Sequence, residues 1–224
     1  MFLKRSFAPE IMDDFSIQDE RIDLALIELT AANKLLGGIS TTESGLKLLL
    51  KGKKDKNISV LDVGAGASDI LQHLPKKLFS MKITSLDLNR RACKFLKEHS
   101  VSTVICADSL HIPVKEKMFD VVHASLFFHH FKEDQIKEML SYLLKISKSG
   151  IIINDLRRSM FALLGIKIVS ALFSKSYMFK NDGPLSVKRG FIKSDWIEIL
   201  NGLGIKEYKL KRKWAFRWML VIYV

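Results

Sequence analysis

The segment VLDVGAGASDI, residues 60–70, combines two glycines with acidic side chains directly after an apolar run. Glycine lacks a Cβ atom, so Gly64 and Gly66 can adopt positive φ values and let a ligand approach the main chain closely. The acids Asp62 and Asp69 lie on either side of the two glycines. A glycine-rich turn between a buried strand and a helix predicts a nucleotide-binding site.

The residue three positions after Gly66 helps to distinguish a dinucleotide from S-adenosylmethionine as the ligand. Dinucleotide-binding turns follow the pattern G-x-G-x-x-G, whose third glycine allows the helix to pack tightly on the strand. Asp69 occupies that position here, and it would place a carboxylate beside a pyrophosphate. S-adenosylmethionine instead carries a sulfonium and an ammonium group, which the carboxylates of Asp62 and Asp69 would attract. The charges favour S-adenosylmethionine, and an NAD-dependent enzyme is the alternative that they disfavour.

Two further acids follow predicted strands. Asp87 ends the second predicted strand, where a carboxylate can accept hydrogen bonds from ribose hydroxyls. Asp108, in CADSLHIPV, ends the third, where it can accept from an adenine amino group while Leu110 packs on the ring. The alternative is that these acids face solvent in ordinary loops. Because they follow successive strands beside a glycine turn, we favour the ligand-binding interpretation.

The elements that must position these residues alternate between strand and helix patterns from residue 58 onward, which is typical of βαβ units around a parallel sheet. Two closing strands separated by a short link fit an antiparallel pair. The predicted strands are residues 58–63, 81–88, 103–107, 119–124, 150–155, 205–210 and 216–224. The predicted helices are residues 68–78, 90–99, 132–146 and 194–203, the last capped by Ser194.

Two segments lie outside this alternation. Residues 1–57 contain apolar residues at helical spacing over 16–36 and a second short helix over 42–51, which predicts an N-terminal helical cap on a domain of residues 58–224. Residues 156–193 form an irregular insert after the fifth strand, with a turn expected at NDGP, residues 181–184. We expect this insert to be a substrate lid and the whole chain to be one structural unit.

The stretches VLDVGAGASDI, SLDLN, CADSLHIPV and FDVVHASLFFHHF, in this order and spacing, resemble class I S-adenosylmethionine-dependent methyltransferases. They are most similar to the small-molecule group (type 11) that includes the quinone-biosynthesis enzymes. The segments PEIMDD and DGPLSVKRGF also resemble a bacterial subgroup associated with polyketide synthases. The resemblance implies an α/β, Rossmann-like, doubly wound sheet of seven strands with the last strand antiparallel, and S-adenosylmethionine as cofactor. The cofactor contacts expected are Asp62, Gly64, Ala65, Gly66, Asp69, Asp87, Leu88, Asp108, Ser109, Leu110 and Ser125.

His129 and His130 follow the fourth predicted strand, whose end faces the methyl group in this architecture. An imidazole that titrates near neutrality could deprotonate a phenol or enol acceptor, so we expect a catalytic residue here. Adjacent side chains point to different sides, and the pair could instead fix the loop. No metal site is expected from the pair, because no Cys or third His lies at ligand spacing.

The formal net charge of +12 over 224 residues raises nucleic acid and anionic membranes as partners. An RNA or protein methyltransferase is therefore an alternative to an enzyme that methylates a small hydrophobic, phenolic or quinone-like acceptor on oxygen or carbon. A cofactor-binding module without catalysis is a third possibility. The N-P-P-Y element of enzymes that methylate exocyclic amines is absent, which disfavours nucleic acid as substrate.

Location within the cell is suggested by two features. Residues 160–173 form the longest apolar run, which Lys167 interrupts and which is too short to span a bilayer, so a lid or a helix in peripheral contact with a membrane is expected. Cys93 and Cys106 lie in predicted core elements, where free thiols are more typical than a disulfide. We expect a cytoplasmic protein.

Overall fold

The computed structural model describes residues 4–51, 57–67, 69–75, 80–112 and 114–224, without the side chain of Asp69. Seven strands form one sheet in the spatial order β3-β2-β1-β4-β5-β7-β6. They are β1 (Asn57–Val63), β2 (Ser80–Asp87), β3 (Thr103–Cys106), β4 (Phe119–Ser125), β5 (Ser147–Leu156), β6 (Tyr208–Lys213) and β7 (Arg217–Tyr223).

Strand direction identifies the class of fold. β1 pairs in parallel with β2 and β4, β2 with β3, and β4 with β5. β7 runs antiparallel to both β5 and β6. The chain leaves β1 toward β2 and later returns to β4 on the other side of β1, which creates the crevice where open α/β sheets bind ligands. The predicted doubly wound sheet with its last strand antiparallel is confirmed.

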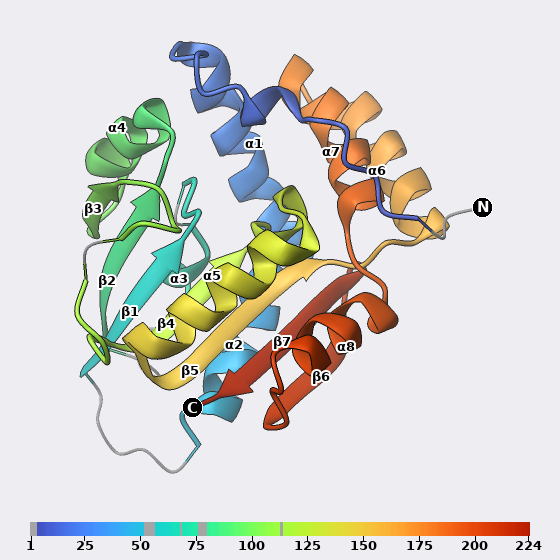
Figure 1. Cartoon of the computed structure of the whole chain (residues 1–224). Helices are drawn as coiled ribbons and strands as arrows, with labels where there is room; N and C mark the ends of the chain where they lie inside the picture. The colour runs from blue at the N-terminus through green and yellow to red at the C-terminus, as the bar shows by residue number, and fades with distance from the viewer. Residues whose placement is uncertain (1–3, 52–56, 68, 76–79, 113) are drawn as a thin grey trace.

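Helices cover both faces of the sheet (Figure 1). α5 and α8 share one apolar core with the sheet, and α2 and α3 share a second core on the opposite face. The helices are α1 (Glu20–Leu35), α2 (Gly38–Leu49), α3 (Asp69–Gln72), α4 (Arg90–His99), α5 (Glu133–Ile146), α6 (Met160–Phe173), α7 (Tyr177–Arg189) and α8 (Lys193–Gly202), with short 3-10 turns η1 (Ile11–Asp13) and η2 (Phe128–His130).

The central strands alternate between these two cores. On β5, Ile151 and Ile153 face the core under α5 and α8, and Ile152 faces the core under α2. All three side chains are fully buried. Burial on both faces explains why these strands appear in the sequence as continuous apolar runs rather than alternating ones.

α1, α6 and α7 form a separate group of helices beside the sheet. α6 packs on α7, and α1 contacts α2, α4 and α7. The N-terminal segment crosses from α1 to α7, where η1 packs against that helix (Figure 1). Residues from opposite ends of the sequence therefore meet near the carboxyl ends of the strands.

The insert 156–193 differs from its predicted irregular structure. It folds into the helical pair α6 and α7, and Asn181–Pro184 lie inside α7 rather than in a turn. The buried carboxylate of Asp182 accepts hydrogen bonds from the backbone N–H groups of Ile11 (2.8 Å) and Met12 (3.0 Å). These tertiary contacts hold the helix in place, although Pro184 supplies no backbone N–H to it.

The helix predicted over residues 68–78 is also wrong in extent. α3 covers only Asp69–Gln72, and the chain then turns at His73 and Leu74. Residues 68 and 76–79 lie outside the described part of the chain. Pro75 restricts the residue before it to extended conformations, which explains why the helix ends early.

Several boundaries shift by one to three residues from those predicted. The helix over 90–99 agrees fully, whereas β6 starts at Tyr208 and not at residue 205. The expected cap of α8, Ser194, lies within the helix. Ile192 is the capping residue, and its backbone N–H donates to Asp195 (2.8 Å).

Two other expectations concern membranes and thiols. In the part of the chain that the structure describes, no helix combines the length and apolar character needed to cross a bilayer. Cys93 and Cys106 are free, as predicted, and burial is the main cause that raises the pKa of the Cys93 thiol to about 12.

Candidate active site

A cavity of about 720 Å³ lies at the carboxyl ends of the strands, between the sheet and the helices α1, α6 and α7. One end, here called the glycine end, is lined by the turn after β1 and the segments that follow β2 and β3. The other, the histidine end, is lined by residues of η1, η2 and α7. The lining includes Gly64, Gly66, Asp87, Leu88, Asp108, Ser109 and Leu110 at the first end, and Glu10, Asp13, His129, His130, Asp182 and Ser186 at the second.

The turn after β1 needs both glycines. Gly64 and Gly66 have φ values of +62° and +52°, in the left-handed region that glycine favours. A Cβ atom on Gly64 would also lie 2.1 Å from the ring of Phe127. Ala65 donates its N–H to the carbonyl of Leu86, 3.0 Å away, which ties the turn to β2.

Asp87 fixes this turn from the end of β2. One carboxylate oxygen accepts from the N–H of Gly66 and the other from the N–H of Asn89, both at 2.9 Å. Burial raises the pKa of Asp87, and these backbone N–H groups oppose that rise. A carboxylate offers about four acceptor positions. Asp87 therefore keeps capacity for hydroxyl donors in the cavity.

The segment after β3 supplies a second carboxylate. Asp108 accepts from the N–H of Leu110 at 3.0 Å and is partly exposed. The side chain of Leu110 lines the same part of the cavity. Ser109 is buried and its hydroxyl contacts the sulfur of Met139 at 3.4 Å, so it points into the core rather than toward a ligand.

Three of the predicted cofactor residues that the structure describes do not line the cavity: Asp62, Ala65 and Ser125. Asp62 is buried beneath it and contacts His123 at 2.7 Å, and His123 in turn contacts Thr42 at 3.0 Å. Asp69 begins α3, and its side chain lies outside the described residues. Within the described part of the chain, the buried hydroxyl of Ser125 has no hydrogen-bond partner.

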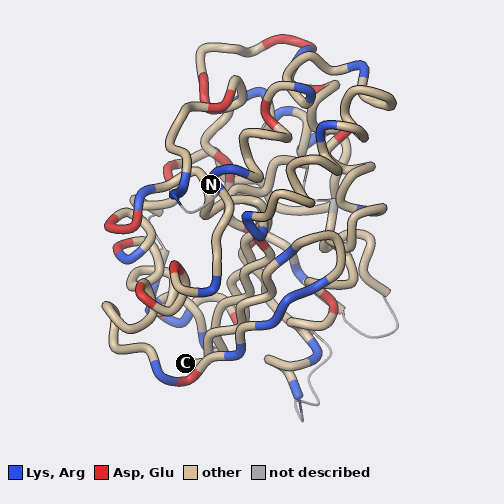
Figure 2. Tube along the Cα trace, turned by 90° about the vertical axis from the view of Figure 1, so that its right-hand side faces the viewer, with Lys and Arg blue, Asp and Glu red and all other residues tan. Residues whose placement is uncertain are grey.

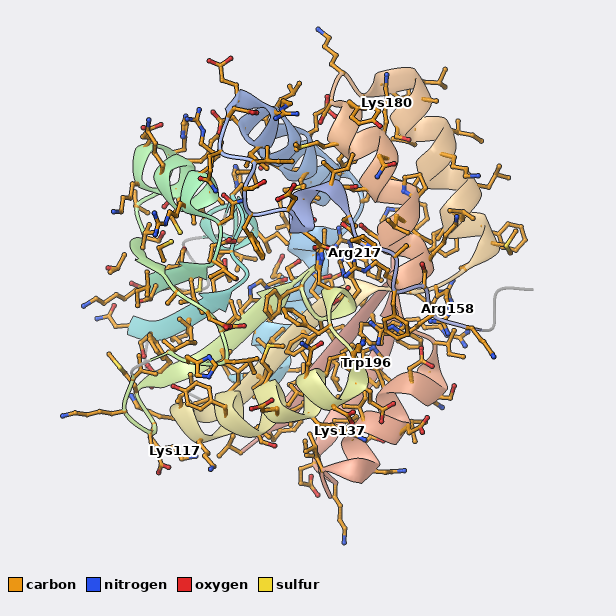
Figure 3. The ribbon with its side chains drawn as sticks, turned by 45° about the horizontal axis from the view of Figure 1, so that its top comes forward. Lys117, Lys137, Arg158, Lys180, Trp196 and Arg217 are labelled. Carbon is orange, nitrogen blue, oxygen red and sulfur yellow. The ribbon has the colours of Figure 1, made fainter. Side chains whose placement is uncertain are left out.

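The cavity is acidic although the chain is basic. Its described lining contains five acids, namely Glu10, Asp13, Asp87, Asp108 and Asp182, against one Lys or Arg side chain, Arg217, and the imidazoles of His129 and His130. Arg217 is labelled in Figure 3. Its guanidinium is already engaged, since it donates to the carbonyl of Leu36 and to the side chains of Asn33 and Asn154. The lining therefore suits a cationic ligand better than a pyrophosphate.

At the histidine end, His129 is oriented by Asp155, the penultimate residue of β5. Its Nδ1 lies 2.7 Å from Asp155 Oδ1, and both side chains are buried. Burial alone would raise the pKa of Asp155, but His129, the backbone N–H of Leu156 and His130 together outweigh burial, and the pKa is lowered. The structure thus places His129 in a carboxylate–imidazole pair with its Nε2 on the side of Glu10.

His130 has a carboxylate partner of its own, Asp13. Its Nδ1 lies 2.6 Å from Asp13 Oδ1, and the guanidinium of Arg189 lies 2.6 Å from the other oxygen. Burial would raise the pKa of Asp13, and the hydrogen bonds from His130 and Arg189 lower it well below the usual range. Both histidines are therefore held by acids from other parts of the chain.

Glu10 completes this group. Its Oε1 lies 3.6 Å from His129 Nε2 and 3.6 Å from the guanidinium of Arg189. Burial raises the pKa of Glu10 to about 7, although His130 and Arg189 act to lower it. Sequence spacing did not identify Glu10, Asp13 or Asp155 as site residues. The only signal was the resemblance of PEIMDD and DGPLSVKRGF to one bacterial subgroup, and these two segments meet here.

Comparison with known proteins identifies one domain in the chain. Residues 60–150 match the family described as "Methyltransferase domain". The chain is 34% identical over 100 residues to the ubiquinone/menaquinone biosynthesis C-methyltransferase of Wigglesworthia glossinidia brevipalpis, which covers 41% of this chain and 39% of that protein. It is 37% identical over 87 residues to the mitochondrial arginine hydroxylase of Mus musculus, covering 38% and 25%.

The solved structures cover more of the chain. A plantazolicin methyltransferase in complex with S-adenosylhomocysteine superposes with a TM-score of 0.64 at 16% identity, covering 95% of this chain and 98% of that one. The domain match over residues 60–150 and the fold shared with S-adenosylmethionine-dependent methyltransferases of known structure agree with the predicted resemblance. The chain spans only about two fifths or less of the length of the curated relatives it matches.

Proposed function

We propose that this protein transfers a methyl group from S-adenosylmethionine to a small hydrophobic acceptor bound in the cavity between the sheet and α1, α6 and α7. The observation that carries the proposal is the acidic lining of a cavity located at the glycine turn of a methyltransferase fold. S-adenosylmethionine supplies an electrophilic methyl group on a sulfonium. The residues of this chain bind it, align the acceptor and exclude water.

Each residue at the glycine end has a proposed role. Asp87 accepts from the ribose hydroxyls, since its carboxylate keeps acceptor capacity after it has bound the turn. Asp108 accepts from the adenine amino group, with Leu88 and Leu110 against the ring. Asp62 supports the glycine turn from beneath, because its contact with His123 ties the end of β1 to β4. The other predicted cofactor residues lie close to these acids in the chain. They are Ala65 in the glycine turn, Asp69 at the start of α3, Ser109 after β3 and Ser125 at the end of β4.

The walls of the histidine end favour an apolar acceptor. The apolar residues that line the cavity include Leu29 of α1, Ile166 and Val169 of α6, Phe179 of α7, and Phe127. A flat phenolic, polyketide-like or quinone-like molecule would fit such walls, and the curated relative named above is a ubiquinone/menaquinone C-methyltransferase. His129 and His130 would then deprotonate the hydroxyl of the acceptor. The resulting phenolate or enolate can take the methyl group on its oxygen or on a conjugated carbon.

We further propose that residues 1–57 act as a cap and 156–193 as a lid within one structural unit. α6 supports this role, because one side of it lines the cavity while the other is apolar and exposed. Phe161, Leu172 and Phe173 of α6 are 76%, 70% and 78% exposed, beside exposed Lys167 and Lys175. This combination suits peripheral contact with an anionic lipid surface, from which a hydrophobic acceptor could enter.

Co-sedimentation with phosphatidylglycerol vesicles tests the lipid contact. Replacing Phe161 and Leu172 by Ser should abolish sedimentation, whereas Val101→Ser, which removes an equally exposed side chain far from α6, should not. Equal sedimentation of all three proteins would refute it.

Nucleic acid as substrate is the less favoured alternative. Figure 2 shows Lys and Arg spread over many segments of the chain, and among the described residues that line the cavity Arg217 is the one Lys or Arg. The cavity itself is acidic, and phosphates would be repelled from it.

Turnover is the direct test of the proposed activity. The protein should transfer a labelled methyl group from S-adenosylmethionine to a lipophilic product when it is incubated with phenolic or quinone-like acceptors. Labelling of RNA or protein with no small product would favour the alternative substrate classes.

A further inference from the structure

Three donor groups converge at the histidine end. One carboxylate oxygen of Glu10 and one ring nitrogen each of His129 and His130 all lie within 4.8 Å of one another. Glu10 and His129 are 6% and 2% exposed. The three residues come from η2 and from the segment before η1, so the fold alone brings them together.

Two of these donor atoms make no hydrogen bond to the described residues. Among the described residues, neither Glu10 Oε1 nor His129 Nε2 has a hydrogen-bond partner, and both atoms are buried. Buried acceptors are almost always satisfied by hydrogen bonds, by water or by an ion. These two atoms lie 3.6 Å apart on side chains that face each other, and the guanidinium of Arg189 lies 3.6 Å from Glu10 Oε1, so the pair is placed to share one cation.

The surroundings of the histidines resemble those of metal ligands. Each imidazole bonds through Nδ1 to a carboxylate, Asp155 for His129 and Asp13 for His130. Histidines that ligate metals commonly donate their other ring N–H to a carboxylate, which fixes the tautomer and leaves Nε2 free to coordinate. The same arrangement occurs here on both histidines.

Distance agrees with a divalent ion. The carboxylates of Glu10 and Asp13 lie near the guanidinium of Arg189, and Asp155 interacts with His129 and Arg5. Two ligands bound tetrahedrally at Zn²⁺ distances lie about 3.4 Å apart, close to the 3.6 Å between Glu10 Oε1 and His129 Nε2. Two nitrogens and one oxygen favour Zn²⁺, Co²⁺ or Fe²⁺ over Mg²⁺.

We propose that Glu10, His129 and His130 bind one divalent transition-metal cation, with Asp155 and Asp13 orienting the two histidines. With three protein ligands the ion keeps an open position toward the cavity, as catalytic sites do. This deepens the proposed function and rests on it, since the open position receives an oxygen of the acceptor.

The metal would replace a free imidazole as the means of activating that oxygen. A hydroxyl bound to the cation loses its proton to water, because coordination lowers its pKa. The oxygen lone pair then forms the bond to the methyl carbon while the sulfur–carbon bond breaks, and its electron pair stays on sulfur. His129 coordinates in this scheme, so it takes no proton.

The test is a titration of the chelator-treated, tag-free full chain with Co²⁺, followed by visible absorption. One equivalent of Co²⁺ should produce a d–d spectrum, Zn²⁺ should abolish it, and excess Mg²⁺ should not. Glu10→Gln and His130→Ala should lose the spectrum, and Asp155→Asn should weaken binding on the order of 10–100-fold. His99→Ala is the matched control, because His99 is exposed and does not line the cavity.

Circular dichroism of each metal-free variant establishes that it is folded. Binding of S-adenosylhomocysteine, measured in parallel, separates the two proposals, because the glycine end contains none of the three ligands. A folded native protein that binds S-adenosylhomocysteine but no Co²⁺ or Zn²⁺ overturns the metal site alone. An unchanged Co²⁺ spectrum in folded Glu10→Gln overturns it as well.

Discussion

The two ends of the cavity are built in different ways. The glycine end consists of loops that directly follow β1, β2 and β3, and its contacts run mainly from side chains to nearby backbone N–H groups, as at Asp87. The histidine end joins η1, η2, β5 and α7 through contacts between charged side chains, such as His129–Asp155. Ligand binding at the first end depends on local structure, whereas the second depends on the whole fold being in place.

This difference predicts different consequences of substitution. Removing one member of the histidine end leaves a buried charge without its partner, which destabilises the fold. Removing an acid at the glycine end should chiefly lower the affinity for the ligand. The predictions below test that separation.

The largest effect is expected for Asp155→Ala. Both Asp155 and His129 are almost completely buried, so the loss of one partner should lower the free energy of unfolding by about 3–5 kcal/mol. Thermal denaturation followed by circular dichroism measures it. Asp14→Ala, which removes an exposed acid in the same N-terminal region as η1, should have little effect. A change in Asp155→Ala no larger than in this control would mean that the pair contributes no stability.

Glu10 should make stability depend on pH. Its pKa in the folded protein is about 7, above the ordinary value of 4.5, so the folded state binds the proton more tightly than the unfolded one. The stability that this protonation provides is fully present below about pH 4.5 and is lost as the pH rises to about 7. A shift of this size corresponds to a change on the order of 3 kcal/mol.

Melting temperatures from pH 5 to 8, measured with chelator present, test this dependence. Glu10→Gln should have a flatter profile than the native protein, because its amide does not titrate. Parallel profiles would show that Glu10 titrates normally, in contrast to its buried position.

A smaller effect, confined to ligand binding, is expected at Asp87. Asp87→Ala should lower the affinity for S-adenosylhomocysteine by roughly 10–100-fold, about 1.4–2.8 kcal/mol. The ribose loses charge-assisted hydrogen bonds, and the glycine turn loses the carboxylate that binds its backbone. Glu116→Ala, an exposed acid outside the cavity, should bind normally. If Asp87→Ala binds as the native protein does, the ribose lies elsewhere.

The contrast between the ends also explains what the sequence could predict. Gly64, Gly66, Asp87 and Asp108 were predicted as site residues because a turn and the acids at strand ends are local patterns, and all four line the cavity. Glu10 and Asp155 were missed because no spacing relates them to His129. The absence of a metal site was predicted from Cys and His alone, so a carboxylate ligand from the N-terminal segment was not considered.

The fold follows the same rule. The order and direction of the strands were predicted correctly because buried runs and loop lengths are visible along the chain. Asn181–Pro184 was predicted as a turn from its composition, yet it is helical because Asp182 binds the backbone of η1. Such tertiary contacts can override the local turn propensity of a segment, and a single sequence does not reveal them.

Isothermal titration of the full chain with S-adenosylhomocysteine tests the central claim, that the acidic cavity at the glycine turn is a site for S-adenosylmethionine. The account predicts one-to-one binding at micromolar concentrations, with NADH giving no signal under the same conditions. An absence of binding at millimolar S-adenosylhomocysteine by the folded protein, or binding of NADH in preference to it, would contradict the account.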